Sequence, residues 1–239
     1  VGSEMCIRDS TEIKNNMLYD QNRSARFAGL TALQYMLQGI TVAGPGLGNS
    51  NTVTIKENTL TGVFNGIELN NLKSAVATVE NNQLQLSDKT MSTIGTPQFG
   101  ISALYCQDAT ISANTVSTST LGSKVNAINM KGFYASKNTN LRLCGNFTNR
   151  IGSAFVFDGK DLQIGTRWIA NTINDGWRGM TLASDIGDQG FMYNWRTVPL
   201  SSFYGPTLNK WNGFGGLKEQ TVTIGLSLIH ISEPTRRTP

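Results

Sequence analysis

Several acidic and basic side chains in the last third of the chain could together carry out acid–base chemistry. Proton abstraction next to a uronate carboxylate needs acidic groups that hold calcium and a basic group that takes the proton. The residues of these types that cluster in the sequence are Asp158, Asp161, Asp185, Asp188, Arg167 and Arg178. We favour the alternative interpretation, that they are solvated turn residues, and therefore assign no catalytic residue.

Aromatic side chains gather in the same third of the chain. Tyrosine and tryptophan combine a large apolar ring with a polar group, so their exposed faces can stack on sugar rings. The candidate ligand-binding residues are Trp177, Tyr193, Trp195, Tyr204 and Trp211. The competing interpretation, which we favour, places Trp168 in the interior of a repeat and the other aromatics in a cap.

Cys106 and Cys144 are 38 residues apart, without the close pairing that a zinc site or a redox dithiol requires. They could form a disulfide between repeats, or both could be free, buried thiols, and we favour the second possibility. We expect neither a metal site nor a cofactor.

The two ends of the chain resemble translated adapter sequence from sequencing-library preparation. Leu226–Arg236 reads LSLIHISEPTR, and the opening VGSEMCIRD matches the opposite strand of the same transposase adapter. We expect residues 1–10 and 226–239 to be artefacts of this origin, which removes them from any argument about the fold. The protein proper is then Thr11–Gly225, truncated at both ends, and the only histidine, His230, lies outside it.

Charge and hydropathy limit the possible partners. The formal net charge is +4, and the basic residues are scattered rather than clustered as a nucleic-acid backbone would require. No apolar run approaches the roughly 20 residues that span a bilayer. We therefore expect neither a nucleic-acid partner nor a transmembrane segment.

An internal repeat is visible once the ends are set aside. Its pattern is apolar-x-apolar-x-x-Asn-x-apolar, as in VTIKENTL and ATVENNQL, and its asparagines are Asn16, Asn58, Asn82, Asn114, Asn146 and Asn171. From Asn58 onward they are separated by 24, 32, 32 and 25 residues, which suits a coil of three short strands with loops of variable length. Asparagine suits a bend because its amide bonds to nearby backbone and it tolerates left-handed torsions. Stacked in register, such amides could also bond along the axis as a ladder.

A second alternating run lies between these asparagines. It begins at Gly66, Gly100, Ala127, Ala154 and Gly179. Period-two alternation predicts strands, and stacked coils would build an interior from Ile55, Val79, Ile111 and Leu143, with Leu60, Leu84 and Val116 also facing inward. The longest candidate helix, Ala25–Leu37, precedes the regular repeats.

These motifs resemble the right-handed parallel β-helix (pectin-lyase-like) superfamily, whose repeats read V-x-I-x-x-N-x-L followed by a glycine-led strand. The resemblance covers about Val53–Ser184, and it implies an all-β solenoid fold. Lyases, polygalacturonases, tail spikes and adhesins share this architecture, so it does not fix an activity. The IGDQG and NKW motifs at Ile186–Gly190 and Asn209–Trp211 are similar to segments of large bacterial surface proteins that carry a C-terminal sorting domain.

The repeats and the resemblance together lead to an expectation for the domains and for the function. We expect parallel β-helix repeats over residues 11–185 and an irregular cap, or the start of another segment, over 186–225. We expect a non-enzymatic scaffold or adhesion segment, secreted or on the outer surface of a bacterium, whose partner is an extracellular glycan or another cell surface. The alternative is a polysaccharide lyase or glycoside hydrolase of the same superfamily whose catalytic coils are partly missing.

Overall fold

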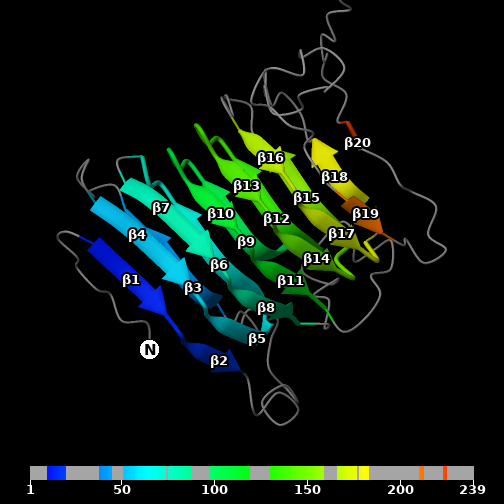
Figure 1. Cartoon of the computed structure of the whole chain (residues 1–239), viewed down its shortest axis with the longest axis horizontal. Coiled ribbons are helices and arrows are strands. Elements are labelled where there is room, and N and C mark those ends of the chain that lie inside the picture. Colours follow the sequence, from blue (N-terminus) through cyan, green and yellow to red (C-terminus); the bar gives the residue numbers. More distant parts are fainter. Residues whose placement is uncertain are drawn as a thin grey trace, which may run out of the picture.

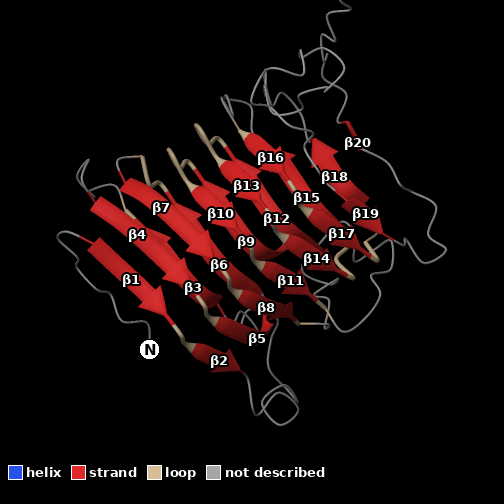
Figure 2. Cartoon of the chain, viewed as in Figure 1, coloured by secondary structure: helices blue, strands red, loops and turns tan. Residues whose placement is uncertain are grey.

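The fold is seen in a computed structural model that describes residues 10–19, 38–44, 51–73, 75–87, 97–118, 130–158, 166–176, 178–182, 210–212 and 223–224. Within these ranges the regular structure consists of strands, without a helix (Figure 2). The candidate helix Ala25–Leu37 lies outside the described residues.

The strands form three parallel sheets that the chain visits in turn (Figure 1). The first sheet contains β1 (Ser10–Lys14), β4 (Asn51–Lys56), β7 (Ala75–Glu80), β10 (Thr110–Ser112), β13 (Arg142–Cys144) and β16 (Arg167–Ile169). The second contains β2 (Met17–Tyr19), β5 (Thr59–Val63), β8 (Gln83–Leu86), β11 (Thr115–Ser117), β14 (Phe147–Asn149), β17 (Thr172–Asn174) and β19 (Lys210–Asn212). The third contains β3 (Gln38–Ala43), β6 (Asn65–Asn70), β9 (Gln98–Leu104), β12 (Met130–Ser136), β15 (Ser153–Asp158), β18 (Arg178–Leu182) and β20 (Thr223–Ile224).

Each strand pairs with its equivalent in the next coil, so the chain is a parallel β-helix, as its repeats predict. The strands β19 and β20 continue the second and third sheets beyond residue 185, by pairing with β17 and β18. Apart from these two strands, residues 186–225 lie outside the described ranges, and the predicted boundary at 185 stays a prediction. Ser10 begins β1, whereas residues 1–9 and 226–239 are not described.

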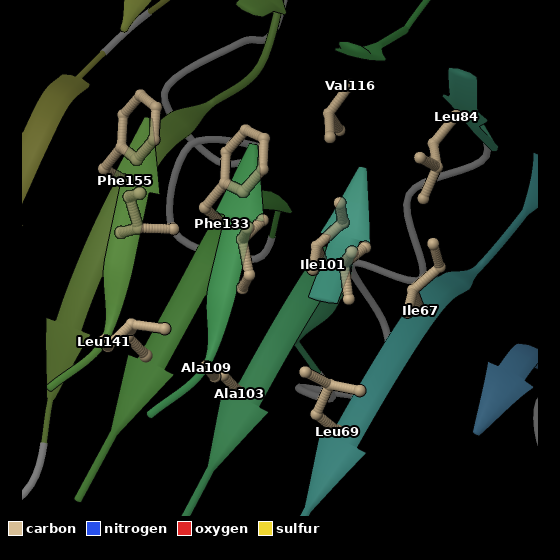
Figure 3. Close-up of a cluster of buried hydrophobic side chains, with 14 of the residues drawn as sticks. Ile67, Leu69, Leu84, Ile101, Ala103, Ala109, Val116, Phe133, Leu141 and Phe155 are labelled. Atoms are coloured by element: carbon tan, nitrogen blue, oxygen red, sulfur yellow. The ribbon is translucent and has the colours of Figure 1, made fainter. Parts of the chain in front are cut away.

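The interior is made of side chains that stack from coil to coil. The predicted inward residues of the first two sheets are all buried: Ile55, Val79, Ile111, Leu143, Leu60, Leu84 and Val116. Figure 3 shows the corresponding row of the third sheet, where Ile67, Ile101, Phe133 and Phe155 are paired in register. The rings of Phe133 and Phe155 stack with centroids 4.8 Å apart. Because each apolar side chain covers the one before it, no coil could bury its core alone.

A ladder of asparagines runs along the turn between the first and second sheets, as predicted. The Nδ2 of each asparagine donates to the Oδ1 of the next, at 2.9 Å from Asn16 to Asn58 and 3.0 Å from Asn146 to Asn171. The same Oδ1 atoms also accept the backbone N–H of the preceding rung, for example Asn58 N to Asn82 Oδ1 at 3.0 Å. The side chains from Asn58 to Asn171 are 0–1% exposed, so each rung holds polar groups that have no access to water.

The left-handed residue of this turn is not the asparagine itself, which corrects the expectation from sequence. The positive φ angles fall on the residue before each rung: Asn15, Glu57, Asn81, Ala113, Gly145 and Ala170. The backbone bends at that residue, and the following asparagine is thereby directed inward. Asparagine is needed here for its amide hydrogen bonds, not for its tolerance of left-handed torsions.

A column of small residues begins the strands of the third sheet. The pairing aligns Gly39, Gly66, Gly100, Gly132, Ala154 and Gly179. The prediction that Ala127 leads the strand of the fourth coil is therefore wrong, because Gly132 holds that position. A Cβ atom at Gly100 would lie 2.4 Å from Cγ1 of Val116 and 2.5 Å from the carbonyl oxygen of Gly132. Close approach of the backbone to the next coil therefore explains the glycines.

The ladder predicts a large loss of stability when one rung is removed. In Asn82→Ala, the backbone N–H of Asn58 loses its acceptor in the interior. The Nδ2 of Asn58 loses one acceptor and keeps the carbonyl oxygens of Lys56 and Ile13. Each buried polar group left without a partner costs about 1–3 kcal/mol. We expect urea unfolding to show a loss of this size or more, whereas Gln85→Ala, an exposed change one strand position beyond Leu84, should change the unfolding free energy little.

The position of the left-handed residue predicts a gain of stability at Ala113. This alanine has φ of 53°, and its side chain is exposed. Glycine adopts this torsion without the Cβ clash, and the relief exceeds its extra entropy loss, so Ala113→Gly should stabilise the fold by roughly 0.5–1 kcal/mol. A melting temperature below that of the wild type would contradict this assignment, and Thr115→Gly, within a strand, should be destabilising.

Candidate binding site on the third sheet

The outward face of the third sheet carries a cluster that we call the lysine–tyrosine cluster: Phe99, Lys131, Tyr134 and Asp158. Alternation in β12 turns Phe133 into the core and leaves Tyr134 on the outer face. Strand pairing places Lys131 beside Phe99, and Asp158 beside Ser136. The four side chains come from β9, β12 and β15 and lie diagonally across the sheet.

Lys131 lies against two aromatic rings. Its Nζ is 4.2 Å from the ring centroid of Tyr134 and 5.3 Å from that of Phe99. The two rings are themselves in contact, with centroids 4.9 Å apart and planes tilted by 32°. These distances suit cation–π attraction, which fixes the lysine above the sheet.

Asp158 completes the cluster. The phenol O–H of Tyr134 donates to Oδ2 of Asp158 at 3.1 Å. The ammonium group, the ring, the hydroxyl and the carboxylate therefore follow one another across three coils. The cluster thus brings an ammonium group, a phenol and a carboxylate together beside two aromatic rings.

The surroundings shift the titration of the central residues. Burial lowers the pKa of Lys131, although the negative charge of Asp158 acts in the opposite direction. Burial also raises the pKa of Tyr134 to about 12, and Asp158 adds to this rise through its charge and its hydrogen bond. Tyr134 is consequently a hydrogen-bond donor throughout the neutral range.

A second aromatic site lies where the third sheet turns toward the first. The ring of Tyr105 is flanked by two lysines, with Nζ of Lys73 at 5.9 Å and Nζ of Lys137 at 5.2 Å from its centroid. Tyr105 is 42% exposed and has φ of 54°, so the turn projects its ring outward. Ser102 is the strand partner of Tyr134, and Tyr105 comes three residues after it. At about 3.3 Å per residue, the two backbone positions are roughly 10 Å apart along the strand.

The candidate catalytic residues that the structure describes do not lie close to one another. Asp158 ends β15, whereas Arg178 begins β18 opposite Ser153, about 16 Å away along the strand direction. Arg167 lies on β16 in the first sheet, with its side chain exposed. Asp161, Asp185 and Asp188 lie outside the described residues, so the enzymatic alternative stays a prediction.

The aromatic residues predicted to bind a ligand are largely outside the described ranges. This holds for Trp177, Tyr193, Trp195 and Tyr204, and Trp211 is described only as a backbone position in β19. Trp168 is buried, as predicted, and its ring lies edge-on against Phe155 at 5.3 Å.

The two described cysteines differ from the prediction that both are buried. Both thiols are free, but only Cys106 is buried, whereas Cys144 is exposed. The cause is the alternation of β13, which turns Leu143 inward and therefore Cys144 outward. Burial raises the pKa of the Cys106 thiol from 9.0 to about 11. Its Sγ donates to the carbonyl oxygen of Leu104 at 3.4 Å.

The described ranges contain neither a metal-binding cluster nor a membrane-spanning helix. No three histidine, cysteine, aspartate or glutamate side chains gather there in a way that could hold a metal ion. The same residues include no helix long and apolar enough to cross a membrane.

The lysine–tyrosine cluster was not found from the sequence because of the alignment at Ala127. With Gly132 as the leading residue, Lys131 takes the position of Phe99, and Tyr134 that of Ser102. The glycine column is therefore the signal that would have brought these residues together.

Comparisons with known proteins identify no relative of this chain. A scan against models of protein families finds no match, and neither a search of curated proteins nor one of solved structures finds a similar chain.

The buried thiol predicts a loss of stability in alkaline solution. Above pH 9 the unfolded chain ionises Cys106, while the folded chain keeps the proton until about pH 11, so unfolding becomes more favourable. A two-unit rise in pKa corresponds to roughly 2–3 kcal/mol. We expect Cys106→Ser to reduce the fall in unfolding free energy between pH 8.5 and about 11, as measured with urea. The exposed change Cys144→Ser should leave the fall unchanged, and equal slopes for both variants would contradict the assignment.

Proposed function

We propose that this chain is a non-enzymatic scaffold or adhesion segment that contacts a glycan through the outward face of its third sheet. The observation that carries the proposal is the lysine–tyrosine cluster together with Tyr105. An aromatic ring offers an apolar face to a sugar ring, while lysine, hydroxyl and carboxylate groups bind its hydroxyls. The two aromatic positions are separated along the sheet by more than one sugar ring, which favours an oligosaccharide over a monosaccharide.

Rigidity supports the same proposal. The buried core and the asparagine ladder hold neighbouring coils in register, so Phe99, Lys131 and Tyr134 are fixed before any ligand arrives. Ordering of side chains and loops is a substantial part of the cost of binding, and a prearranged site avoids much of it. A long stiff body is also well suited to presenting such a face at a distance from its attachment point.

The setting of the protein belongs to the same proposal. The sequence resemblance to the pectin-lyase-like β-helix superfamily, and to large bacterial surface proteins, favours a secreted or surface-exposed location. A polysaccharide lyase or glycoside hydrolase with catalytic coils partly missing is the competing function.

Glycan binding should depend on the third sheet. We expect the full chain to bind at least one class of immobilised oligosaccharide, neutral or acidic. Tyr105→Ala should weaken that binding about tenfold, because stacking on an aromatic ring is worth roughly 1–2 kcal/mol in comparable sites. Lys131→Ala should also weaken it, whereas Arg142→Ala, an exposed change on the first sheet, should not.

Three results would count against this function. Binding to no oligosaccharide class would remove glycan contact, and binding that survives both third-sheet variants would place it elsewhere. Release of unsaturated products or new reducing ends from a bound polysaccharide would favour the enzymatic alternative. Circular dichroism and melting curves of each variant distinguish loss of the site from loss of the fold.

A further inference from the structure

The amine of Lys131 is held partly out of water in the middle of the stack. Its Nζ lies against the rings of Tyr134 and Phe99, at 4.2 Å and 5.3 Å from their centroids, and its side chain is only partly exposed. Lys73, by contrast, is exposed, and its Nζ approaches the single ring of Tyr105 at 5.9 Å. The two lysines therefore offer the same chemical group in two different surroundings.

The surroundings of Lys131 favour the unprotonated form of its amine. Loss of water is the larger influence and lowers the pKa of Lys131, while the carboxylate of Asp158 acts in the opposite direction. On the other side of Lys131, β9 (QFGISAL) carries no charged residue, and Arg178 lies two coils on in the same column. A lysine attacks carbon only through its unprotonated amine, and burial of this kind is how lysines become nucleophiles in proteins.

The groups beside the amine suit its addition to a carbonyl group. The phenol O–H of Tyr134 donates to Oδ2 of Asp158 at 3.1 Å, and with a pKa of about 12 this phenol keeps its proton. A fixed donor next to the amine can stabilise the negative charge that develops on a carbonyl oxygen under attack. The carboxylate of Asp158 favours a positive charge on the nitrogen after the reaction.

We propose that Lys131 is a reactive amine that condenses with aldehydes on the outer face of the third sheet. Nζ forms a bond to the carbonyl carbon, the two hydrogens of the neutral amine leave with the carbonyl oxygen as water, and an imine remains. A proton from solvent then makes the imine nitrogen a cation beside Asp158. The open-chain form of a reducing sugar is one aldehyde of this class, but the reaction does not rest on the glycan contact proposed above.

The test compares the lysines of the intact full chain with one another. The protein is incubated with glyceraldehyde and cyanoborohydride, which reduces each imine to a stable secondary amine, and peptide mass spectrometry gives the labelling rate at each lysine. We expect Lys131 to be labelled several-fold faster than Lys73 at neutral pH. The ratio of the two rates should fall as the pH approaches 10.5, the ordinary pKa of lysine, because Lys73 then loses its proton as well.

Two variants distinguish the contribution of the phenol from a general effect of substitution. Tyr134→Phe keeps the ring beside Nζ and removes the hydroxyl, so labelling at Lys131 should slow while labelling at Lys73 is unchanged. Ser112→Ala removes a hydroxyl on the first sheet and should leave both rates unchanged. If Tyr134→Phe does not fold, which circular dichroism would show, the rates in the wild-type chain decide the proposal.

Two results in the wild-type chain would overturn the proposal. Labelling of Lys131 at or below the rate of Lys73 would mean that attraction of the rings for the ammonium form outweighs the loss of water. A ratio that does not change with pH would mean that Lys131 is only more accessible and not more reactive. Neither measurement involves glycan binding, so this proposal and the proposed function can fail separately.

Discussion

The buried asparagine ladder is the interaction on which the rest of the structure depends. An amide in an apolar interior must have its hydrogen bonds, since each missing bond costs more than a made bond contributes. In this chain the partners of Asn82 are Asn58, Asn114 and the carbonyl oxygen of Ile55, in coils on either side. Satisfying one rung therefore fixes the register of three coils, and the hydrophobic columns follow that register.

The outer face inherits its order from this interior. Lys131, Tyr134 and Asp158 are separated by 27 residues of sequence at most, but it is strand pairing that brings them within bonding distance. A slip of one residue in β12 would turn Tyr134 inward and Phe133 outward. The cluster is for this reason a consequence of the ladder and the core, although it touches neither.

The sequence predicted the interior better than the exterior, for a physical reason. Asn58, Val79 and Leu84 belong to columns in which burial restricts the side chain, so the pattern repeats and can be read from one chain. The third sheet begins with a glycine whose role is a close backbone approach, and this leaves a weaker signal, so Ala127 was mistaken for its equivalent. Outward residues such as Cys144 are not restricted by burial. Their positions can therefore be assigned only when the register of the strands is known.

The turn after the first sheet and the turn after the third sheet differ in how much variation they permit. The turn after the first sheet has asparagine at every inward position, whereas the turn after the third sheet has Leu72, Cys106 and Asn138. Asn138 bonds there as a ladder residue does, to the backbone N–H of Cys106 at 2.9 Å and the carbonyl oxygen of Ala103 at 2.9 Å. Since one uniform ladder already sets the register, the second turn is free to change. Tyr105 lies in that turn, so the variable part of each coil is also the part that borders the proposed binding face.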